Sequence, residues 1–139
     1  MKALRLIVRT VWMQAQQLLA PYELAGPPYI VPSGEQLLAW LELQPSASVR
    51  LLLLDYQVQG GTILQILPSI RSPAGTHHPA LRDDAVLIGW SIHTDAAEAF
   101  RQAGGVDGFI SKRRSVKQLI PDILHILAQK RQAMRWVEL

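Results

Sequence analysis

The sequence contains no cysteine, and this absence excludes two kinds of site. Disulfide bonds cannot brace the fold, and no thiolate can hold a zinc ion or an iron–sulfur cluster. A chain without cysteine is compatible with a reducing compartment, so we expect a cytoplasmic protein. Its 139 residues, 49% of them hydrophobic, suit a single domain whose core is large enough to fold without such braces.

Long hydrophobic runs are also missing. No apolar stretch reaches the roughly 20 residues that a membrane-spanning helix requires. The N-terminal segment 1–11 carries Arg9 inside its apolar part and lacks the small-residue cleavage site of a signal peptide. We therefore expect neither a leader segment nor a membrane partner.

Neither sign of charge dominates, because the chain has 14 Lys and Arg residues and 11 Asp and Glu residues, which gives a net charge of +3. The dense basic clusters lie at 112–114 and 130–131. No nucleic-acid-binding motif and no interleaved aromatic residues accompany them. We interpret the clusters as solvated faces and expect no nucleic acid as a partner.

The hydrophobic pattern alternates between strand and helix signals along the chain. Apolar runs predict five strands, at Ala3–Val8, 29–31, 50–55, 85–90 and 107–111. Apolar residues at helical spacing predict five helices, over 10–19, 34–41, 63–70, 95–103 and 116–127. This order predicts an α/β fold, a doubly wound five-stranded parallel sheet in a (βα)5 three-layer sandwich.

Proline and glycine positions refine this pattern. The prolines around 29–31 favour an edge strand there, and Ser33 begins a capping-box sequence. Pro121 lies inside the last apolar stripe, so either a separate turn precedes the main helix or the helix is kinked. The segment 71–84 is the longest irregular one, and its role stays open between a functional appendage and a surface insertion.

One predicted strand ends in a carboxylate. Four leucines, 51–54, run directly into Asp55, which predicts a buried central strand with an acidic residue at its carboxyl end. In a parallel sheet the carboxyl ends of the strands meet at one edge, where ligands bind. The residues that follow the other strands at this edge are Arg9, Thr10, Ser91 and Lys112.

The runs LLLLDYQVQGG and VLIGWSIHTDAAEAFRQAGGVDGFISK resemble the receiver domain of two-component response regulators. The resemblance spans about residues 2–128. It implies a flavodoxin-like sheet of strand order 2-1-3-4-5 in one domain over 1–139, with the C-terminal helix extending to 139 and no output domain. It also implies that Asp55 is the phosphoacceptor-equivalent residue, Ser91 the switch hydroxyl, and Lys112 a phosphate-binding or counter-ion lysine.

The sequence departs from that family at its metal site. Family members hold Mg²⁺ with an acidic pair at the end of the first strand, and Arg9 and Thr10 stand there in this chain. Two carboxylates replaced by a cation and a hydroxyl change the local formal charge by about +3, which opposes binding of a hard cation. We therefore expect no cofactor and a pseudo-receiver in which Arg9 and Lys112 pair with Asp55. Any metal would have only Asp55 and the backbone of Gln57 as ligands.

Other residues carry weaker signals. An alignment without a gap places Trp90, instead of Ser91, at the position of the switch hydroxyl. The histidines His77, His78 and His93 lack a third ligand at a defined spacing, so they favour solvated side chains over a metal site.

Three functions fit these observations. We favour a signalling module that is not an enzyme and acts on a protein partner: a histidine kinase, an output protein, or a second copy bound through the region of the last helix. The first alternative is a working response regulator phosphorylated on Asp55 with Mg²⁺. The second is a flavodoxin-like domain that binds a small ligand, although Gly60-Gly61 and Gly104-Gly105 match no phosphate-binding fingerprint.

Overall fold

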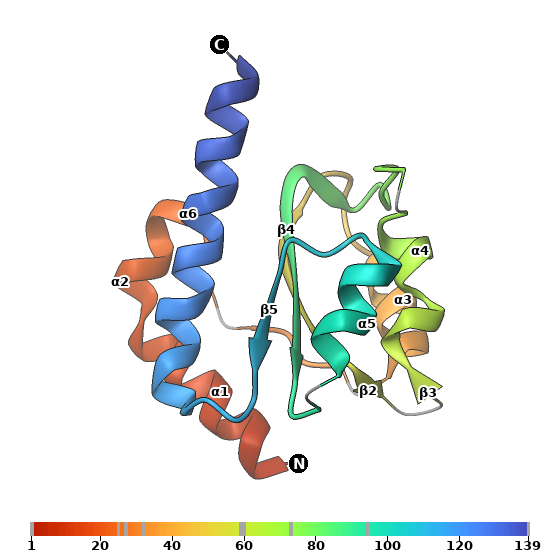
Figure 1. Cartoon of the computed structure of the whole chain (residues 1–139). Helices are drawn as coiled ribbons and strands as arrows, with labels where there is room; N and C mark the ends of the chain where they lie inside the picture. The colour runs from red at the N-terminus through yellow and green to blue at the C-terminus, as the bar shows by residue number, and fades with distance from the viewer. Residues whose placement is uncertain are drawn as a thin grey trace. The chain divides into compact units, whose positions relative to one another are not determined.

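The computed structural model divides the chain into two compact units (Figure 1). The first comprises Met1–Ile30 and Lys112–Leu139, and the second comprises Val31–Ser111. The structure describes residues 2–24, 26, 28–31, 33–58, 61–72, 74–93 and 95–138, with the side chains at 2–6, 57–58 and 132–138 left out. Segments from both ends of the chain therefore build the first unit.

The first unit is helical. Its N-terminal elements are α1 (Lys2–Gln14), α2 (Gln16–Leu19) and the 3₁₀ turn η1 (Ala20–Tyr22). Its C-terminal elements are the 3₁₀ turn η3 (Val116–Gln118) and the long helix α6 (Leu119–Glu138). The buried apolar side chains of this unit come from both parts: Trp12, Leu19, Leu119, Ile120, Ile123 and Leu127.

Polar contacts support this unit. The indole N–H of Trp12 donates to the carbonyl oxygens of Leu24 and Gly26, at 3.0 and 3.1 Å. The guanidinium of Arg131 in α6 donates to the carbonyl oxygen of Pro21 at 2.6 Å and lies 4.1 Å from the centre of the Tyr22 ring. The two ends of the chain are thus joined by a cation–π contact and a hydrogen bond.

Helix α1 corrects the sequence prediction for the N-terminus. The expected strand Ala3–Val8 and helix 10–19 are replaced by one continuous helix, Lys2–Gln14. A short apolar run cannot be assigned to strand or helix by periodicity alone, and Ala, Leu and Arg are strong helix formers. Arg9 and Thr10 consequently lie exposed on a helix, so their predicted place at the end of a strand is wrong. The predicted edge strand at 29–31 is also irregular.

The turn η3 settles the position of Pro121. Ser115 caps this turn by accepting a hydrogen bond from the backbone N–H of Lys117 at 3.2 Å. Helix α6 then begins at Leu119, which places Pro121 in its first turn. A residue there needs no intrahelical N–H partner, so proline is tolerated. A separate turn before the main helix is therefore confirmed.

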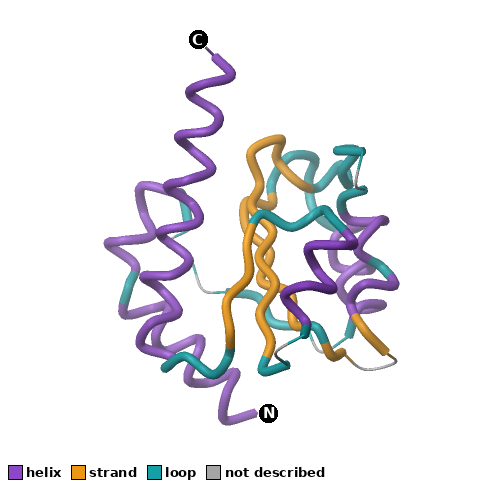
Figure 2. The backbone as a smooth tube through the Cα atoms, viewed as in Figure 1, coloured by secondary structure: helices purple, strands orange, loops and turns teal. Residues whose placement is uncertain are grey.

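The second unit contains the sheet (Figure 2). Strands β1 (Val49–Asp55), β4 (Leu81–Ser91) and β5 (Gly108–Ser111) are parallel, in the order β1-β4-β5. A small antiparallel hairpin, β2 (Gln57–Val58) with β3 (Gly61–Thr62), follows β1. The three central predictions, at 50–55, 85–90 and 107–111, are confirmed as strands of one parallel sheet. The predicted five-strand order is not reproduced, since this sheet has three strands in the described residues.

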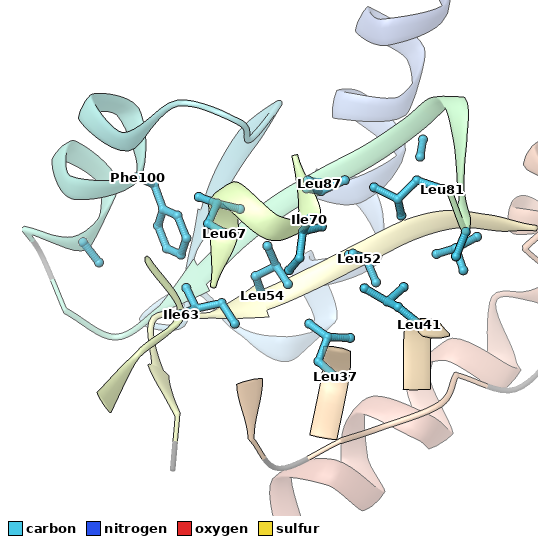
Figure 3. Close-up of a cluster of buried hydrophobic side chains, with 14 residues drawn as sticks. Leu37, Leu41, Leu52, Leu54, Ile63, Leu67, Ile70, Leu81, Leu87 and Phe100 are labelled. Carbon is cyan, nitrogen blue, oxygen red and sulfur yellow. The ribbon is translucent and has the colours of Figure 1, made fainter. Parts of the chain in front are cut away.

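Helices cover one face of this sheet. They are α3 (Gly34–Glu42), the 3₁₀ turn η2 (Ile63–Gln65), α4 (Leu67–Ile70) and α5 (Ala96–Ala103). Figure 3 shows Leu37 and Leu41 of α3 directed toward Leu52 and Leu54 of β1, in the main cluster of buried side chains. Ser33 caps α3 by accepting from the N–H of Gln36 at 3.1 Å, as the capping-box sequence predicted.

Strand β4 begins earlier than predicted. Its register with β1 jumps from Val49↔Leu81 to Leu51↔Val86, so β4 carries extra residues at its amino end. Side-chain hydrogen bonds from Arg82 hold the pKa of Asp84 below its ordinary value; they outweigh the opposing effect of burial, and the positive charges of Arg82 and Arg50 lower the pKa further. Part of the segment predicted as an irregular loop is therefore an irregular strand.

An ion pair lies between the residue that follows α4 and the residue that precedes β5. Arg71 donates to the carboxylate of Asp107 at 2.9 Å, and the same carboxylate oxygen accepts from the N–H of Leu87 at 2.9 Å. Arg71 also donates to the carbonyl oxygen of Gly105 at 3.3 Å. Gly105 has a φ of +85°, and a Cβ there would lie 2.7 Å from the carbonyl oxygen of Arg71. The conformation and the close approach both require glycine.

Removal of the Asp107 carboxylate tests the importance of this ion pair. Asp107→Ala should lower the free energy of unfolding by about 3 kcal/mol, because a mostly buried guanidinium loses its counter-ion. Urea denaturation followed by circular dichroism measures this change. Glu98→Ala, which breaks the exposed ion pair with Arg101, is the control and should leave the midpoint nearly unchanged. Equal effects of the two substitutions would contradict a dominant role for Asp107.

Gly89 in β4 supplies a second test of packing. A Cβ at this position would lie 2.7 Å from the ring of Phe100, which is fully buried. Gly89→Ala should therefore destabilise the protein by about 1–3 kcal/mol through overpacking. Gly26→Ala is the matched control, since a Cβ there meets no atom within 4 Å. A thermal melt of both variants decides the comparison, and a wild-type melting temperature for Gly89→Ala would refute the clash.

Candidate functional site

The carboxyl edge of the sheet brings Asp55 beside Trp90. Asp55 is the last residue of β1, and its partner in register on β4 is Trp90, which in turn pairs with Ile110 on β5. Residues in register on adjacent strands direct their side chains to the same face. The half-buried Asp55 therefore has an indole side chain as its neighbour on β4.

Ser91 is one residue further along β4 and pairs with Ser111 of β5. Because side chains alternate along a strand, Ser91 is directed to the face opposite that of Asp55. Its side chain is fully buried, and its hydroxyl oxygen accepts a hydrogen bond from the N–H of His93 at 3.1 Å. The register thus agrees with the ungapped alignment, which put Trp90 in the hydroxyl position. The role of Ser91 as a switch stays a prediction.

Aromatic side chains gather next to Asp55. The ring of Tyr56 meets the ring of His93 edge-on at 6.2 Å and that of Phe100 at 5.8 Å. Phe100 in turn lies 6.0 Å from Phe109 of β5. Ile92, between β4 and α5, is 56% exposed. Sequence reasoning assigned no role to Tyr56 and considered His93 only as a metal ligand, although each follows the carboxyl end of a strand.

The remaining predicted site residues belong to the first unit. Lys112 follows the last residue of β5 directly and is half-buried. Arg9 and Thr10 lie on α1. The structure therefore brings Asp55, Trp90 and Ser91 to one sheet edge, while the expected pairing of Asp55 with Arg9 and Lys112 stays a prediction.

The donor atoms at this edge do not fit Mg²⁺. This ion prefers an octahedron of oxygen ligands with carboxylates among them. The described residues contain no group of three or more His, Asp or Glu side chains that could hold a metal. Asp55 has Trp90 beside it in the sheet, and an indole supplies no oxygen. Gln57, whose backbone was the other expected ligand, forms part of the β2–β3 hairpin and pairs with Thr62.

His77 and His78, in the segment before β4, each contact a carboxylate away from the carboxyl edge of the sheet. His77 Nε2 lies 3.0 Å from an Asp83 oxygen, and His78 Nε2 lies 3.0 Å from a Glu42 oxygen. His78 Nδ1 also accepts from the N–H of Ala80 at 3.0 Å, so its Nε2 carries the proton donated to Glu42. These contacts anchor the segment before β4.

Comparisons with known proteins give a result at the level of the fold. No protein-family model and no curated protein matches the chain. The signal receiver domain of a protein described as a Luxo repressor, from Vibrio parahaemolyticus, matches with a TM-score of 0.57 and 16% identity, over 89% of this chain and 86% of its own. A CheY-like response regulator receiver domain protein from Methanospirillum hungatei matches with a TM-score of 0.56 and 16% identity, over 91% and 92%.

The fold resembles that of a receiver domain. Identity of 16% carries the likeness no further than the fold, which is α/β with a parallel sheet. Within the described residues, no helix is long and apolar enough to span a membrane. The receiver-like fold expected from the sequence is thus supported, and its chemistry has to be argued from the residues at the carboxyl edge.

Ser91 offers a test at this edge. Ser91→Ala removes the buried acceptor of the His93 N–H, so it should lower the free energy of unfolding by about 1 kcal/mol. Urea denaturation measures the loss. Ser69→Ala, at an exposed position of α4, should be nearly neutral. Unchanged stability of Ser91→Ala would show that the hydroxyl does not support the turn after β4.

Proposed function

We propose that this protein is a signalling module of the pseudo-receiver type, which acts by binding another protein without Mg²⁺-dependent phosphorylation. The observation that carries the proposal is the register of the sheet, which sets Trp90 beside Asp55. The receiver-like fold supplies the signalling context.

The chemistry of phosphoryl transfer supports this reading. A carboxylate that attacks a phosphoryl group needs a cation to neutralise the oxygens and small polar groups to hold the product. Beside Asp55 an indole occupies space that a small hydroxyl would leave open, and it provides no metal ligand. The Ser91 hydroxyl at the end of β4 is buried, and it accepts a hydrogen bond from the backbone N–H of His93. The residue in register with Asp55 on β4 thus offers neither a cation nor a hydroxyl to a phosphoryl group.

The proposal describes a protein that is not an enzyme and needs no cofactor. Its partner is a protein, with a histidine kinase, an output protein and a second copy as the open choices. The basic residues near α6 are partly engaged within their own unit, since Arg114 binds the Asp122 carboxylate at 2.7 Å. These residues are therefore weaker candidates for a partner surface than their number suggests.

A working phosphoacceptor is the second candidate, because Asp55 ends a strand at the carboxyl edge and is only half-buried. In that case the metal would bind through Asp55 and backbone oxygens. The small-ligand alternative has no comparable support, since the glycine pairs match no phosphate-binding pattern.

Incubation with acetyl phosphate and Mg²⁺ separates the two candidates. We expect no phosphoryl adduct in the intact mass, because the metal site is incomplete. A receiver domain known to be phosphorylated serves as the positive control, and Asp55→Asn serves as the site control. An adduct on the wild-type protein that disappears in Asp55→Asn would establish the phosphoacceptor function and refute the proposal.

A thermal-shift measurement extends this test to binding. Beryllium fluoride with Mg²⁺, a non-covalent phosphoryl analogue, should leave the melting temperature unchanged. Nucleotides and flavin should also give no shift. A stabilisation by beryllium fluoride would favour the phosphoacceptor, and a stabilisation by a nucleotide or flavin would favour the small-ligand domain.

A further inference from the structure

Two adjacent histidines, His77 and His78, precede β4 at the amino edge of the sheet. The carbonyl oxygen of His78 accepts a hydrogen bond from the N–H of Leu81, the first residue of β4, at 3.0 Å. The backbone N–H of His78 donates to the carbonyl oxygen of Ile70 in α4 at 2.8 Å. The backbone of this segment is therefore bonded to α4 and to the start of β4.

The two residues after His78 bind the start of β1. The carbonyl oxygen of Pro79 accepts from the N–H of Ala47, and that of Ala80 accepts from the N–H groups of Ser48 and Val49, each at 2.9 Å. Ala47 has a φ of +55°, a left-handed conformation that is uncommon for a residue with a side chain. The position of the chain before β1 therefore depends on the segment 77–80.

The hydrogen bonds of His77 require a charged ring. Its Nδ1 lies 3.0 Å from the carbonyl oxygen of His78, and its Nε2 lies 3.0 Å from a carboxylate oxygen of Asp83. Both partners are acceptors, so both ring nitrogens have to donate, and a ring with protons on both nitrogens is the imidazolium. Loss of one proton removes one of these hydrogen bonds. The stabilisation from His77 is therefore present at low pH and lost as the pH rises through the range in which histidine loses its charge.

The hydrogen bonds of His78 require a neutral ring. Its Nδ1 accepts from the N–H of Ala80 at 3.0 Å, and its Nε2 lies 3.0 Å from a carboxylate oxygen of Glu42. A proton on Nδ1 would leave the N–H of Ala80, a buried residue, without its acceptor. The charge of Glu42 favours the protonated ring, but this side chain is 74% exposed and its attraction is weak. The stabilisation from His78 is therefore present at high pH and lost as the pH falls.

The carboxylates do not cause this difference, because each ring faces one of them. Asp83 of β4 faces His77, and Glu42 of α3 faces His78. The difference arises at Nδ1, which contacts an acceptor in His77 and a donor in His78.

Other charged residues near the rings bind carboxylates of their own. Arg82 and Asp84, on either side of Asp83, contact each other at 2.8 Å. Arg71, whose backbone forms an isolated bridge with that of His77, directs its guanidinium to the carboxylate before β5 at 2.9 Å.

We propose that His77 and His78, with Asp83 and Glu42, form a pH-responsive clasp that is complete only when His77 is charged and His78 is neutral. At lower pH the N–H of Ala80 loses its acceptor, and at higher pH His77 loses one of its two contacts. In both directions the segment 77–80 holds the starts of β1 and β4 less firmly. The clasp goes beyond the proposed signalling role and does not depend on the chemistry of the carboxyl edge.

Nitrogen-15 NMR of the histidine rings tests the charge states in the wild-type protein. A titration from about pH 5 to about pH 8, where histidine changes its charge, should contain a range in which both ring nitrogens of His77 carry protons and Nδ1 of His78 carries none. Spectra of His77→Gln and His78→Gln assign the signals. Two rings that gain and lose their protons together, or a charged His78 beside a neutral His77, would overturn the proposal.

Amide hydrogen exchange of the full chain measures the effect of the clasp on the start of β1. The protection factors of the Ser48 and Val49 amides, which correct for the intrinsic effect of pH on exchange, should be highest in this range and fall about tenfold on either side of it. Glutamine keeps a hydrogen-bonding side chain but cannot change its charge. His77→Gln should therefore abolish only the fall at high pH, and His78→Gln only the fall at low pH.

Two controls make the exchange measurement specific. His125→Gln, at an exposed position of α6, should keep both falls. The amide of Gly104, which donates to the carbonyl oxygen of Phe100 at the end of α5, should show neither. Protection factors of Ser48 and Val49 that do not change with pH, or that keep both falls in each clasp variant, would refute the clasp. The ring spectra of the wild type decide the case if a variant does not fold.

Discussion

The packing of Leu52 and Leu54 against the helices of the second unit determines what the candidate site can do. Side chains alternate along a strand, so burial of these two leucines in the helix-covered core directs Asp55 to the other face. The register with β4 then fixes its neighbour as Trp90. The burial of these leucines thus determines which side chain lies beside Asp55. A one-residue shift of the register between β1 and β4 would bring Asp55 next to Ser91, but it would also turn Leu52 and Leu54 out of the core.

The position of β5 depends on a different kind of contact. The Asp107 carboxylate accepts from both Arg71 and the backbone N–H of Leu87, which aligns the start of β5 with the middle of β4. A buried ion pair can fix one arrangement of the strands when its charged groups are hydrogen-bonded, and both Arg71 and Asp107 form such bonds. Asp107, which lies in the motif that carried much of the receiver resemblance, therefore has a structural role in this chain.

Much of the second unit could be predicted from the sequence, because its signals are local. The leucine run, the capping residue Ser33 and the strand at 107–111 each depend on periodicity or on one cap. The strand predicted at 3–8 was wrong because a short apolar run fits either element, and its assignment depends on tertiary packing. The neighbour of Asp55 could not be chosen from sequence, since one gap in the alignment exchanges Trp90 for Ser91 and only the strand register decides between them.

The helical form of the N-terminal segment also bears on the carboxyl edge of the sheet. Residues 2–14 form a helix, and the sheet of the second unit ends at β1. In the fold expected from the sequence, a strand from this segment would have brought Arg9 and Thr10 to the carboxyl edge of the sheet. Because these two residues lie on a helix, no strand register relates them to Asp55, and the residue that the register of the sheet sets beside Asp55 is Trp90. The proposed metal-independent signalling therefore depends on the register between β1 and β4 and not on the N-terminal segment.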